Sequence, residues 1–503
     1  MSTEEEARQT IDDLLAKAGW HVADADQVNI HAHQGVAIRE FPLPGHGFAD
    51  YLLYVGGKAA GVVEAKKQGV TLTGVETQSD KYTKGLPSGL PAWRMPLPFS
   101  YQSTGVETRF TNGLNLEPRS RAVFAFHEPK TLADWLDEAR AFEAVVGLRS
   151  GDAPDLFAAD VVAERRGRTF LERMQYMPPL VDKLWPPKPK AIENIERSLR
   201  ENRPRALVQM ATGSGKTLLA IVLAYRLLKF AGARRILFLV DRGNLADQTL
   251  KEFQQYASPY NNFKFTEEYI VQRLTSNTLD NTARVCISTI QRMYSMLKGR
   301  DLPEDLDEVS AGLLPPLQRA GRGGNGAGIF SEPESIEYNK DIPIETFDII
   351  VTDECHRSIY NLWAQVLEYF DAYLIGLTAT PNKQTFGFFH KNLVMEYNHE
   401  MAVADGVNVN YDVYRICTEI TGAGSKVDAG YFVEKQERET RAKRWEQLDE
   451  DLDYEAKQLD RDVVAPDQIR TIIRTFRDKL PTEIFPGREW VPKTLAAMTC
   501  PRL

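Results

Sequence analysis

The sequence predicts an α/β protein in three parts: a mixed α/β domain, a lobe built on a parallel sheet, and a helical, charged C-terminal segment. Between 204 and 381, short apolar runs alternate with helical stretches, as in parallel sheets covered on both faces. Nearer the N-terminus, two strand-like runs flank Gly56-Gly57, which is a hairpin signal. The 43% hydrophobic and 26% charged content excludes a collagen-like or wholly disordered chain.

The first domain is predicted over 1–165. Its opening helix has apolar residues at helical spacing, and Gly19 follows them. Residues 85–120 are rich in glycine, proline, serine and threonine, so we expect mostly loops there. The predicted elements are a helix over 4–19, strands over 51–55, 59–64 and 121–126, and a helix over 131–146.

The remaining boundaries follow changes in composition. We predict a linker and entry segment over 166–203, a parallel-sheet lobe over 204–400 with an insertion over 299–345, and a C-terminal part over 401–503. The lobe's predicted strands are 206–210, 236–240, 285–288, 347–352 and 373–377. Residues 433–462 are densely charged and are predicted to form a solvated helix.

A phosphate-binding loop is predicted directly after the first strand of the lobe, in the run ATGSGKT. Glycines let backbone N–H groups close around phosphate oxygens, a lysine reaches the β/γ-phosphates, and a threonine hydroxyl can ligate Mg²⁺. Met210 stands where the stricter pattern has glycine. The predicted nucleotide-binding residues are Thr212, Gly213, Ser214, Gly215, Lys216 and Thr217.

Two more motifs follow predicted strands of the same lobe. The run DECH places Asp353 and Glu354 where open α/β sheets bind ligands. Asp353 is expected to hold the Mg²⁺ water shell, and Glu354 to orient and deprotonate the attacking water. The run TATP follows a further strand and taken alone predicts only a turn.

A second metal site is predicted in the first domain, where Asp50, Glu64 and Lys66 form a D-x13-E-x-K pattern. Two carboxylates can share Mg²⁺, while a lysine activates a water against a phosphodiester. With a tight two-residue turn at Gly56-Gly57, Asp50 would oppose Val63 instead of Glu64. An odd loop or one bulge brings Asp50 opposite Glu64, and we predict the odd loop.

Composition limits the remaining possibilities. The net charge of −9 excludes a globally basic nucleic-acid coat but leaves room for a local basic groove. No apolar run has the length of a membrane span, and the acidic N-terminus is unlike a signal peptide. Four scattered cysteines predict neither a disulfide framework nor a zinc site. A cytoplasmic protein without a membrane partner is expected.

The motifs ATGSGKT, DECH and TATP, in this order, resemble the first RecA-like motor lobe of superfamily 2 helicases and translocases. The resemblance implies that Thr378 and Thr380 link the nucleotide site to DNA. Arg242, Thr289 and Gln291 lie in segments where such lobes contact the DNA backbone. The D…ExK pattern, with Gln78 and Tyr82 after it, resembles PD-(D/E)xK nucleases of the RecB-like branch. Glu6 is a candidate for a further carboxylate.

A RecB-like nuclease followed by such a motor resembles the restriction (R) subunit of type I restriction–modification enzymes. The resemblance implies an ATP- and Mg²⁺-dependent endonuclease that acts on double-stranded DNA with methylation and specificity subunits. Two alternatives remain open: a stand-alone nuclease–helicase of DNA repair or phage defence, and a non-catalytic remnant that binds DNA or a partner.

The sequence departs from this family at two places. Lys188 stands near the position where the family carries a glutamine that reads adenine. The run 491–495 resembles the first strand of a second motor lobe, but the residues after it do not continue that pattern. The second lobe supplies arginines that raise hydrolysis by about 10³–10⁵ in related enzymes, so we expect this chain alone to be motor-deficient.

Overall fold

The computed structural model describes residues 3–26, 29–43, 47–72, 83–87, 89–148, 169–181, 183–302, 307, 335–359, 362–414, 416, 425–427, 432–436, 443–447, 452–454 and 466–494. The chain divides into two compact units, Met1–Asn408 and Val409–Leu503. The first unit holds two seven-stranded sheets. In the described part of the chain, no helix combines the length and apolar character that a membrane span requires.

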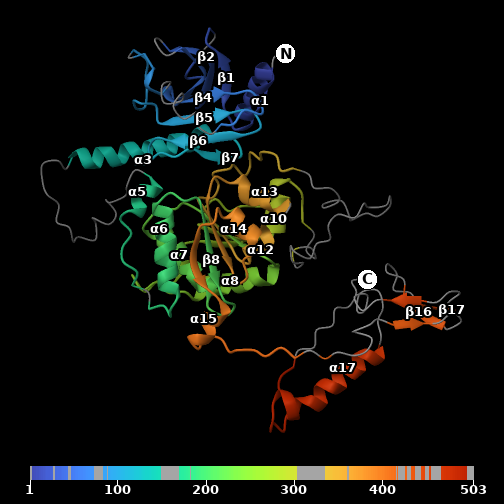
Figure 1. Cartoon of the computed structure of the whole chain (residues 1–503). Coiled ribbons are helices and arrows are strands. Elements are labelled where there is room, and N and C mark those ends of the chain that lie inside the picture. The colour runs from blue at the N-terminus through green and yellow to red at the C-terminus, as the bar shows by residue number, and fades with distance from the viewer. Residues whose placement is uncertain are drawn as a thin grey trace. The chain divides into compact units, whose positions relative to one another are not determined.

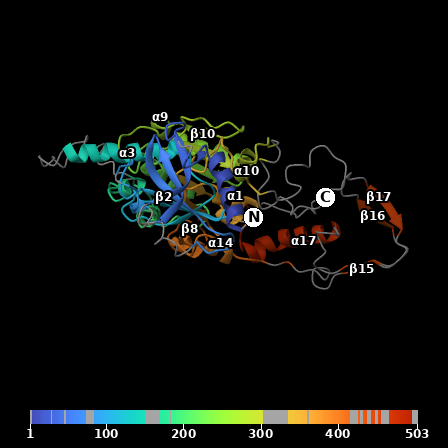
Figure 2. The same cartoon turned by 90° about the horizontal axis from the view of Figure 1, so that it is seen from above.

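The first sheet is mixed and runs in chain order from β1 to β7 (Figure 1). Pairs β1–β2 and β4–β5 are parallel, and the others are antiparallel. Helix α3 runs beside this sheet and projects past its edge (Figure 1 and Figure 2). The elements are α1 (Thr3–Lys17), β1 (His21–Asp24), β2 (Gly35–Leu43), β3 (Gly47–Val55), β4 (Lys58–Ala65), β5 (Phe99–Ser103), β6 (Thr108–Asn112), β7 (Arg121–Val123) and α3 (Pro129–Leu148).

The β3–β4 hairpin closes with the two-residue turn Gly56-Gly57, in which both residues have positive φ. The predicted odd loop is therefore wrong. The register shifts within the hairpin instead, because Leu53 pairs with Gly61 while Tyr54 pairs with Ala59, which leaves Ala60 as a bulge. Beyond the bulge, Tyr51 pairs with Val63.

The two faces of the first sheet explain this register. Leu53 and Val63 belong to the core cluster that also contains the apolar face of α1, whereas Leu52 and Val62 pack in a cluster on the other face. Because strand side chains alternate, Asp50 and Glu64 lie on the same face as Leu52 and Val62. The bulge thus keeps both strands in phase with their cores and brings the two carboxylates onto one face.

The second sheet is parallel throughout, in the order β10-β11-β9-β12-β13-β8-β14. Each of the five predicted strands is present, and β10 and β14 add the two edges. The strands are β8 (Arg205–Met210), β9 (Ile236–Val240), β10 (Val271–Arg273), β11 (Val285–Thr289), β12 (Ile349–Thr352), β13 (Tyr373–Thr378) and β14 (Leu393–Tyr397). The α/β fold with a RecA-like parallel sheet is confirmed.

Helices cover both faces of this sheet, which is why its strands are apolar on both sides. On one face, Phe238 and Val240 share a core cluster with α6 (Lys188–Arg200), α7 (Lys216–Lys229) and α8 (Gly243–Gln255). On the other face, Leu237 and Leu239 share a cluster with α10 (Ile290–Leu297) and α13 (Leu362–Tyr369). Figure 1 shows α6 and α7 on one side and α10 and α13 on the other.

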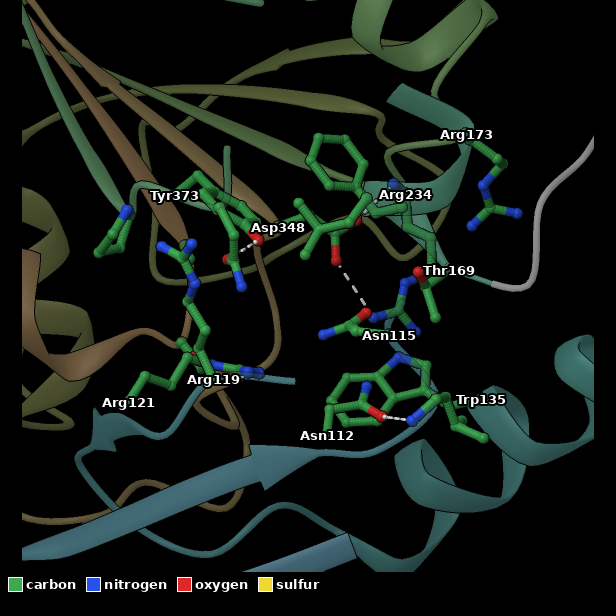
Figure 3. Close-up of a pocket in the computed structure, with 18 of the residues that line it drawn as sticks. Asn112, Asn115, Arg119, Arg121, Trp135, Thr169, Arg173, Arg234, Asp348 and Tyr373 are labelled. Atoms are coloured by element: carbon green, nitrogen blue, oxygen red, sulfur yellow. Dashed lines mark hydrogen bonds and ion pairs between the residues drawn. The ribbon is translucent and has the colours of Figure 1, made fainter. Parts of the chain in front are cut away.

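The first sheet contacts the second sheet at the N-terminal ends of strands β12 and β13. The Arg121 guanidinium at β7 binds the Asp371 carboxylate just before β13, with both N–O distances at 2.6 Å. His127 Nε2 lies 2.8 Å from the same carboxylate. A cavity of about 290 Å³ opens beside this contact, lined also by Trp135 and Arg234 (Figure 3). The cavity lies at the N-terminal ends of the parallel strands, whereas the ATGSGKT, DECH and TATP loops lie at their C-terminal ends.

In its described residues, the second unit contains two short antiparallel strand pairs, an α-helix and a π-helix. The predicted helix over 433–462 is wrong for its described residues, because its three described segments form strands: β16 pairs with β17, and β18 pairs with β15. In the predicted strand 491–495, the described residues 491–494 do not form a strand, and residue 495 lies outside the described residues. Nearly all of the predicted insertion 299–345 before Ser335 also lies outside them. The elements are β15 (Ser425–Val427), β16 (Phe432–Gln436), β17 (Lys443–Gln447), β18 (Leu452–Tyr454), α17 (Pro466–Lys479) and the π-helix η3 (Leu480–Ile484).

Candidate functional site

Asp50 on β3 is fixed by contacts to both of its carboxylate oxygens. The Ala65 backbone N–H donates to Oδ2 at 2.9 Å, and Arg8 Nη2 on α1 lies 2.7 Å from Oδ1. The side chain is 18% exposed, so it is held near the surface of the domain without being buried in it. These contacts aim the carboxylate toward the end of β4, where Glu64 lies.

Glu64 and Lys66 complete the predicted group at the end of β4. Glu64 is 4% exposed, and its Oε1 lies 2.6 Å from Lys66 Nζ. The Lys66 backbone N–H donates to Ser103 O at 2.8 Å, which holds the residue beside β5. Since Tyr51 pairs with Val63, Asp50 is opposite Glu64 in register. The structure therefore brings Asp50, Glu64 and Lys66 together.

The donor set fits a hard divalent cation. Mg²⁺ is commonly held by one or two carboxylates, with waters and substrate phosphate as its other ligands. Asp50 and Glu64 supply two carboxylates on one face, and Arg8 and Lys66 are the cations that balance them. No group of three His, Cys, Asp or Glu side chains suited to a metal occurs among the described residues.

Three predicted nuclease residues lie outside the description. Gln78 and Tyr82 fall in the range 73–82, whose placement the structure does not describe. Glu6 lies in α1, but its side chain is outside the described side chains. Their predicted roles remain predictions.

Sequence reasoning missed Arg8, which reaches from α1 to Asp50 and also pairs with Glu40 at 2.7 Å. A basic residue in an amphipathic helix carries no signal for such a contact. A cavity of about 480 Å³ opens beside this pair and is lined by Arg8, Asp24, Ala25, Asp26, Arg39, Glu40, Asp50 and Tyr51. The carboxylate of Asp50 is thus next to a space that can admit a ligand.

The predicted phosphate loop joins the end of β8 to the start of α7. Gly215 has a φ of 85°, a left-handed conformation suited to glycine, and it caps the helix whose first turn points N–H groups outward. The Ser214 hydroxyl donates to Ala211 O at 2.6 Å and closes the loop. Lys216 is buried and donates to Met210 O at 3.4 Å, while Thr212 and Gly213 are exposed.

The two acids of the DECH run lie beside this loop. Glu354 Oε1 is 3.6 Å from Lys216 Nζ, and Glu354 takes a left-handed backbone conformation with a φ of 47°. Such strain in a residue other than glycine is concentrated at functional sites. Burial and the neighbouring Glu354 charge raise the pKa of Asp353 to about 6. The arrangement brings Lys216, Asp353 and Glu354 into one site, beside Thr217 on the first turn of α7.

A hydrogen-bonded chain connects the DECH run to the TATP run. His356 Nδ1 lies 2.9 Å from Thr378 Oγ1, and the Thr380 backbone N–H donates to the same hydroxyl at 3.2 Å. Thr378 is buried, whereas Thr380 is exposed. His356 also lies 3.3 Å from Glu354, so the predicted nucleotide site is physically joined to the surface at Thr380.

The three predicted DNA-backbone donors differ in exposure. Arg242 caps α8 and is 40% exposed, so it is available to a phosphate. Thr289 and Gln291 are 2% and 0% exposed. Thr289 caps α10 by accepting from the Arg292 backbone N–H, and its hydroxyl donates to Asp307. In this structure the latter two side chains support the lobe and do not present donors to solvent.

Lys188 is the first residue of α6 and is 7% exposed. Its Nζ donates to Ser214 O of the phosphate loop at 3.2 Å. Sequence reasoning also missed Asn408, whose Nδ2 donates to Thr212 O at 3.1 Å. The residue type alone, a lysine in the first turn of a helix or an isolated asparagine, does not predict such a contact.

Comparison with known proteins gives two family matches. Residues 182–383 match the model of the type III restriction enzyme res subunit, and residues 25–96 match the second domain of the type I restriction enzyme EcoKI endonuclease subunit. The two segments contain, respectively, the nucleotide motifs and the D…ExK pattern.

Two curated relatives are endonuclease subunits of type I restriction enzymes from Escherichia coli. The EcoKI subunit of strain K12 is 25% identical over 92% of this chain, and the EcoAI subunit is 24% identical over 84%. These matches cover 40% and 44% of the relatives, so the chain spans about two fifths of their length.

Among solved structures, a fragment of an HsdR subunit from Vibrio vulnificus YJ016 is 20% identical, covers 81% of this chain and 61% of that chain, and has a TM-score of 0.30. The sequence matches confirm the resemblance to type I restriction R subunits.

Proposed function

We propose that this chain, as a relative of type I restriction endonuclease subunits, cleaves DNA at Asp50, Glu64 and Lys66 and binds ATP at the motor lobe of the same unit. The observation that carries the proposal is the register of the β3–β4 hairpin. The bulge at Ala60 brings Asp50 opposite Glu64, next to Lys66, as a metal-dependent nuclease requires.

At the nuclease centre, Asp50 and Glu64 would hold Mg²⁺. The bound ion would polarise the phosphodiester and lower the pKa of a water. Asp50 enters this role already oriented, because the Ala65 N–H holds one oxygen. Lys66 keeps its ammonium beside Glu64, where it can orient a water or balance charge on the phosphate.

At the motor lobe, the loop 211–215 and Lys216 would hold the ATP phosphates, and Thr217 and Asp353 would hold the accompanying Mg²⁺. Glu354 is the expected base for the attacking water. Its contacts to Lys216 and His356 keep the carboxylate at the site and connect it to Thr378. ATP-driven movement along DNA is proposed for the multi-subunit enzyme, not for this chain alone. The curated relatives of this chain are longer than it is.

The proposed partners are double-stranded DNA and the methylation and specificity subunits of a type I complex, in the cytoplasm. Arg242 and Thr380 are the exposed residues of the motor lobe proposed to meet DNA or couple to it. The proposed domain limits are 1–165 for the nuclease, 166–203 for the entry segment, 204–400 for the motor lobe and 401–503 for the C-terminal part.

The experiment is cleavage of supercoiled plasmid by the purified chain in Mg²⁺, with Asp50→Ala as the test variant and Asp13→Ala, an exposed residue of α1, as its control. The proposal predicts cleavage by the wild type and the control alone. Binding to DNA without cleavage would favour a non-catalytic remnant. Failure to co-purify with methylation and specificity subunits would favour a stand-alone nuclease–helicase.

A further inference from the structure

Two carbonyl oxygens of the phosphate loop accept hydrogen bonds from side chains that lie outside the loop. Asn408 Nδ2 donates to Thr212 O at 3.1 Å, and Lys188 Nζ donates to Ser214 O at 3.2 Å. Lys188 begins α6, before the first strand of the parallel sheet, whereas Asn408 follows α15 (His399–Ala404), after the last strand of that sheet in chain order. The loop is therefore held from two segments that are far apart in the sequence.

The Asn408 amide is fixed beside the loop by its own backbone. Its backbone N–H donates to Ala402 O at 3.0 Å, and Ala402 is fully buried. A Cβ at Gly213 would lie 3.4 Å from Asn408 Oδ1, so the amide packs against the loop backbone. The loop is in turn joined to β14, because the Ala211 N–H donates to Tyr397 O at 2.8 Å. The Asn408 side chain thus connects two anchored segments.

The contact from Asn408 sets the direction of one peptide group. A trans peptide is planar, so its C=O and its N–H point in opposite directions. Because the Thr212 C=O points to Asn408, the Gly213 N–H points away from Asn408. The Ser214 C=O and the Gly215 N–H are related in the same way. Gly213 and Gly215 have φ values of 82° and 85°, and backbone N–H groups in such left-handed turns form concave sites for anions.

A glycine makes this orientation easy to lose. Without a Cβ, Gly213 adopts many backbone conformations at little cost, so the Thr212–Gly213 peptide can turn over and present its oxygen to the ligand side. A carbonyl oxygen carries a partial negative charge and repels the phosphate that an N–H group attracts. The hydrogen bond from Asn408 opposes this turn, because the turn would break it.

We propose that Asn408 is a positioning residue of the nucleotide site: it holds the Thr212 carbonyl outward, so that the Gly213 N–H is preorganised for the phosphates of the ligand. The inference rests on the proposed nucleotide site and concerns its triphosphate-binding part, so it applies equally to ATP and to inorganic tripolyphosphate. Lys188 makes the corresponding contact to the Ser214 carbonyl. Asn408 is the last residue of the first unit, so its hydrogen bond joins the nucleotide site to the chain that leaves this unit.

The test is binding of a fluorescent ATP analogue to the full chain in Mg²⁺, with ATP and inorganic tripolyphosphate as competitors. Asn408→Ala should weaken both competitors by about fivefold, as expected when one orienting hydrogen bond is lost. Asn408→Asp keeps the shape of the side chain but, when ionised, has no N–H to donate, and it should weaken both at least as much. Asn410→Ala, an exposed asparagine two residues further on, is the matched control and should keep the wild-type affinities. The urea midpoints of all three variants should equal that of the wild type.

The two competitors separate phosphate positioning from other roles. Wild-type affinity in Asn408→Ala or in Asn408→Asp overturns the inference, because the donor is then not needed, and if one of these variants does not fold the other decides. Weaker binding of ATP with unchanged binding of tripolyphosphate also overturns it, since Asn408 then acts on the nucleoside. A lower urea midpoint with unchanged affinities assigns Asn408 a purely structural role and overturns it as well. If the wild type binds neither competitor, the proposed nucleotide site itself fails and the inference falls with it.

Discussion

The Ala65 backbone N–H donates a hydrogen bond to the Asp50 carboxylate at 2.9 Å, across the β3–β4 hairpin. This bond joins the two strands at the point where the proposed nuclease centre lies. It depends on the register set by the bulge at Ala60, because slipping the pairing by one residue would move Asp50 opposite Val63. The geometry of the centre is therefore a property of the hairpin.

Asp50→Asn should weaken divalent-cation binding without unfolding the domain. The asparagine oxygen can still accept from the Ala65 N–H, but the negative charge that holds the cation is lost. We expect Mn²⁺ affinity, measured by electron paramagnetic resonance, to fall at least about tenfold, with little change in thermal stability. Asp13→Asn is the control, and equal Mn²⁺ binding by both variants would remove Asp50 from the metal site.

Glu354→Gln should separate nucleotide binding from hydrolysis. The glutamine keeps a polar contact near Lys216 but cannot take a proton from water, so ATP binding persists while turnover falls at least about 10²-fold. Lys216→Ala should lower binding itself, since it removes the phosphate-binding ammonium. Binding by calorimetry and phosphate release by a coupled assay check the pair. Wild-type turnover in Glu354→Gln would exclude Glu354 as the base.

Asp353 should make folding stability depend on pH. Its folded pKa of about 6 lies above the usual value of 3.8, so the ionised carboxylate costs stability in the fold. The contribution of Asp353 to the free energy of unfolding is therefore largest below pH 3.8 and declines as the pH rises to about 6. Asp353→Asn should remove this decline. The difference in the free energy of unfolding between Asp353→Asn and the wild type should therefore be larger at pH 7 than at pH 4, by roughly 2–3 kcal/mol in favour of the variant.

Urea unfolding in a chelating buffer, where no metal compensates the charge, measures that difference. A wild type that gains stability relative to Asp353→Asn between pH 4 and pH 7 would contradict the prediction.

Arg121→Ala should destabilise the contact between the two sheets. Burial alone would raise the pKa of Asp371, but Arg121 and His127 hold it well below its usual range. Removing the guanidinium leaves a buried carboxylate poorly compensated, which costs about 3–5 kcal/mol. Arg119→Ala, an exposed arginine in the same cavity, should cost less than about 0.5 kcal/mol. Equal urea midpoints for the two variants would show that the Arg121 pair does not stabilise this contact.

Much of the second sheet was predictable because its strands are buried on both faces and are apolar at every position. The loops that follow them carry the motifs, so the grouping of Lys216, Asp353 and Glu354 followed from the strand pattern. The burial of Thr289 and Gln291 did not, since a polar side chain after a strand can cap a helix or face solvent, and only packing decides between these.

The first sheet was less accessible from sequence. Strands β5 and β6 lie within 85–120, where glycine and proline suggested loops, although the buried Phe99, Tyr101 and Phe110 mark alternating positions. The sequence allows an odd loop or a bulge at an unspecified residue, and alanine carries no signal that would place the bulge at Ala60. The choice depends on which face of each strand meets its core, and that is a tertiary property.

The most direct test of the proposed cutting centre is nicking of supercoiled plasmid by Lys66→Ala and Lys67→Ala in Mg²⁺. The two lysines are neighbours in sequence, but Lys66 contacts Glu64 and Lys67 is exposed. The account predicts that Lys67→Ala nicks at the wild-type rate and that Lys66→Ala is slower by about 10² or more. Equal nicking by the two variants would contradict it.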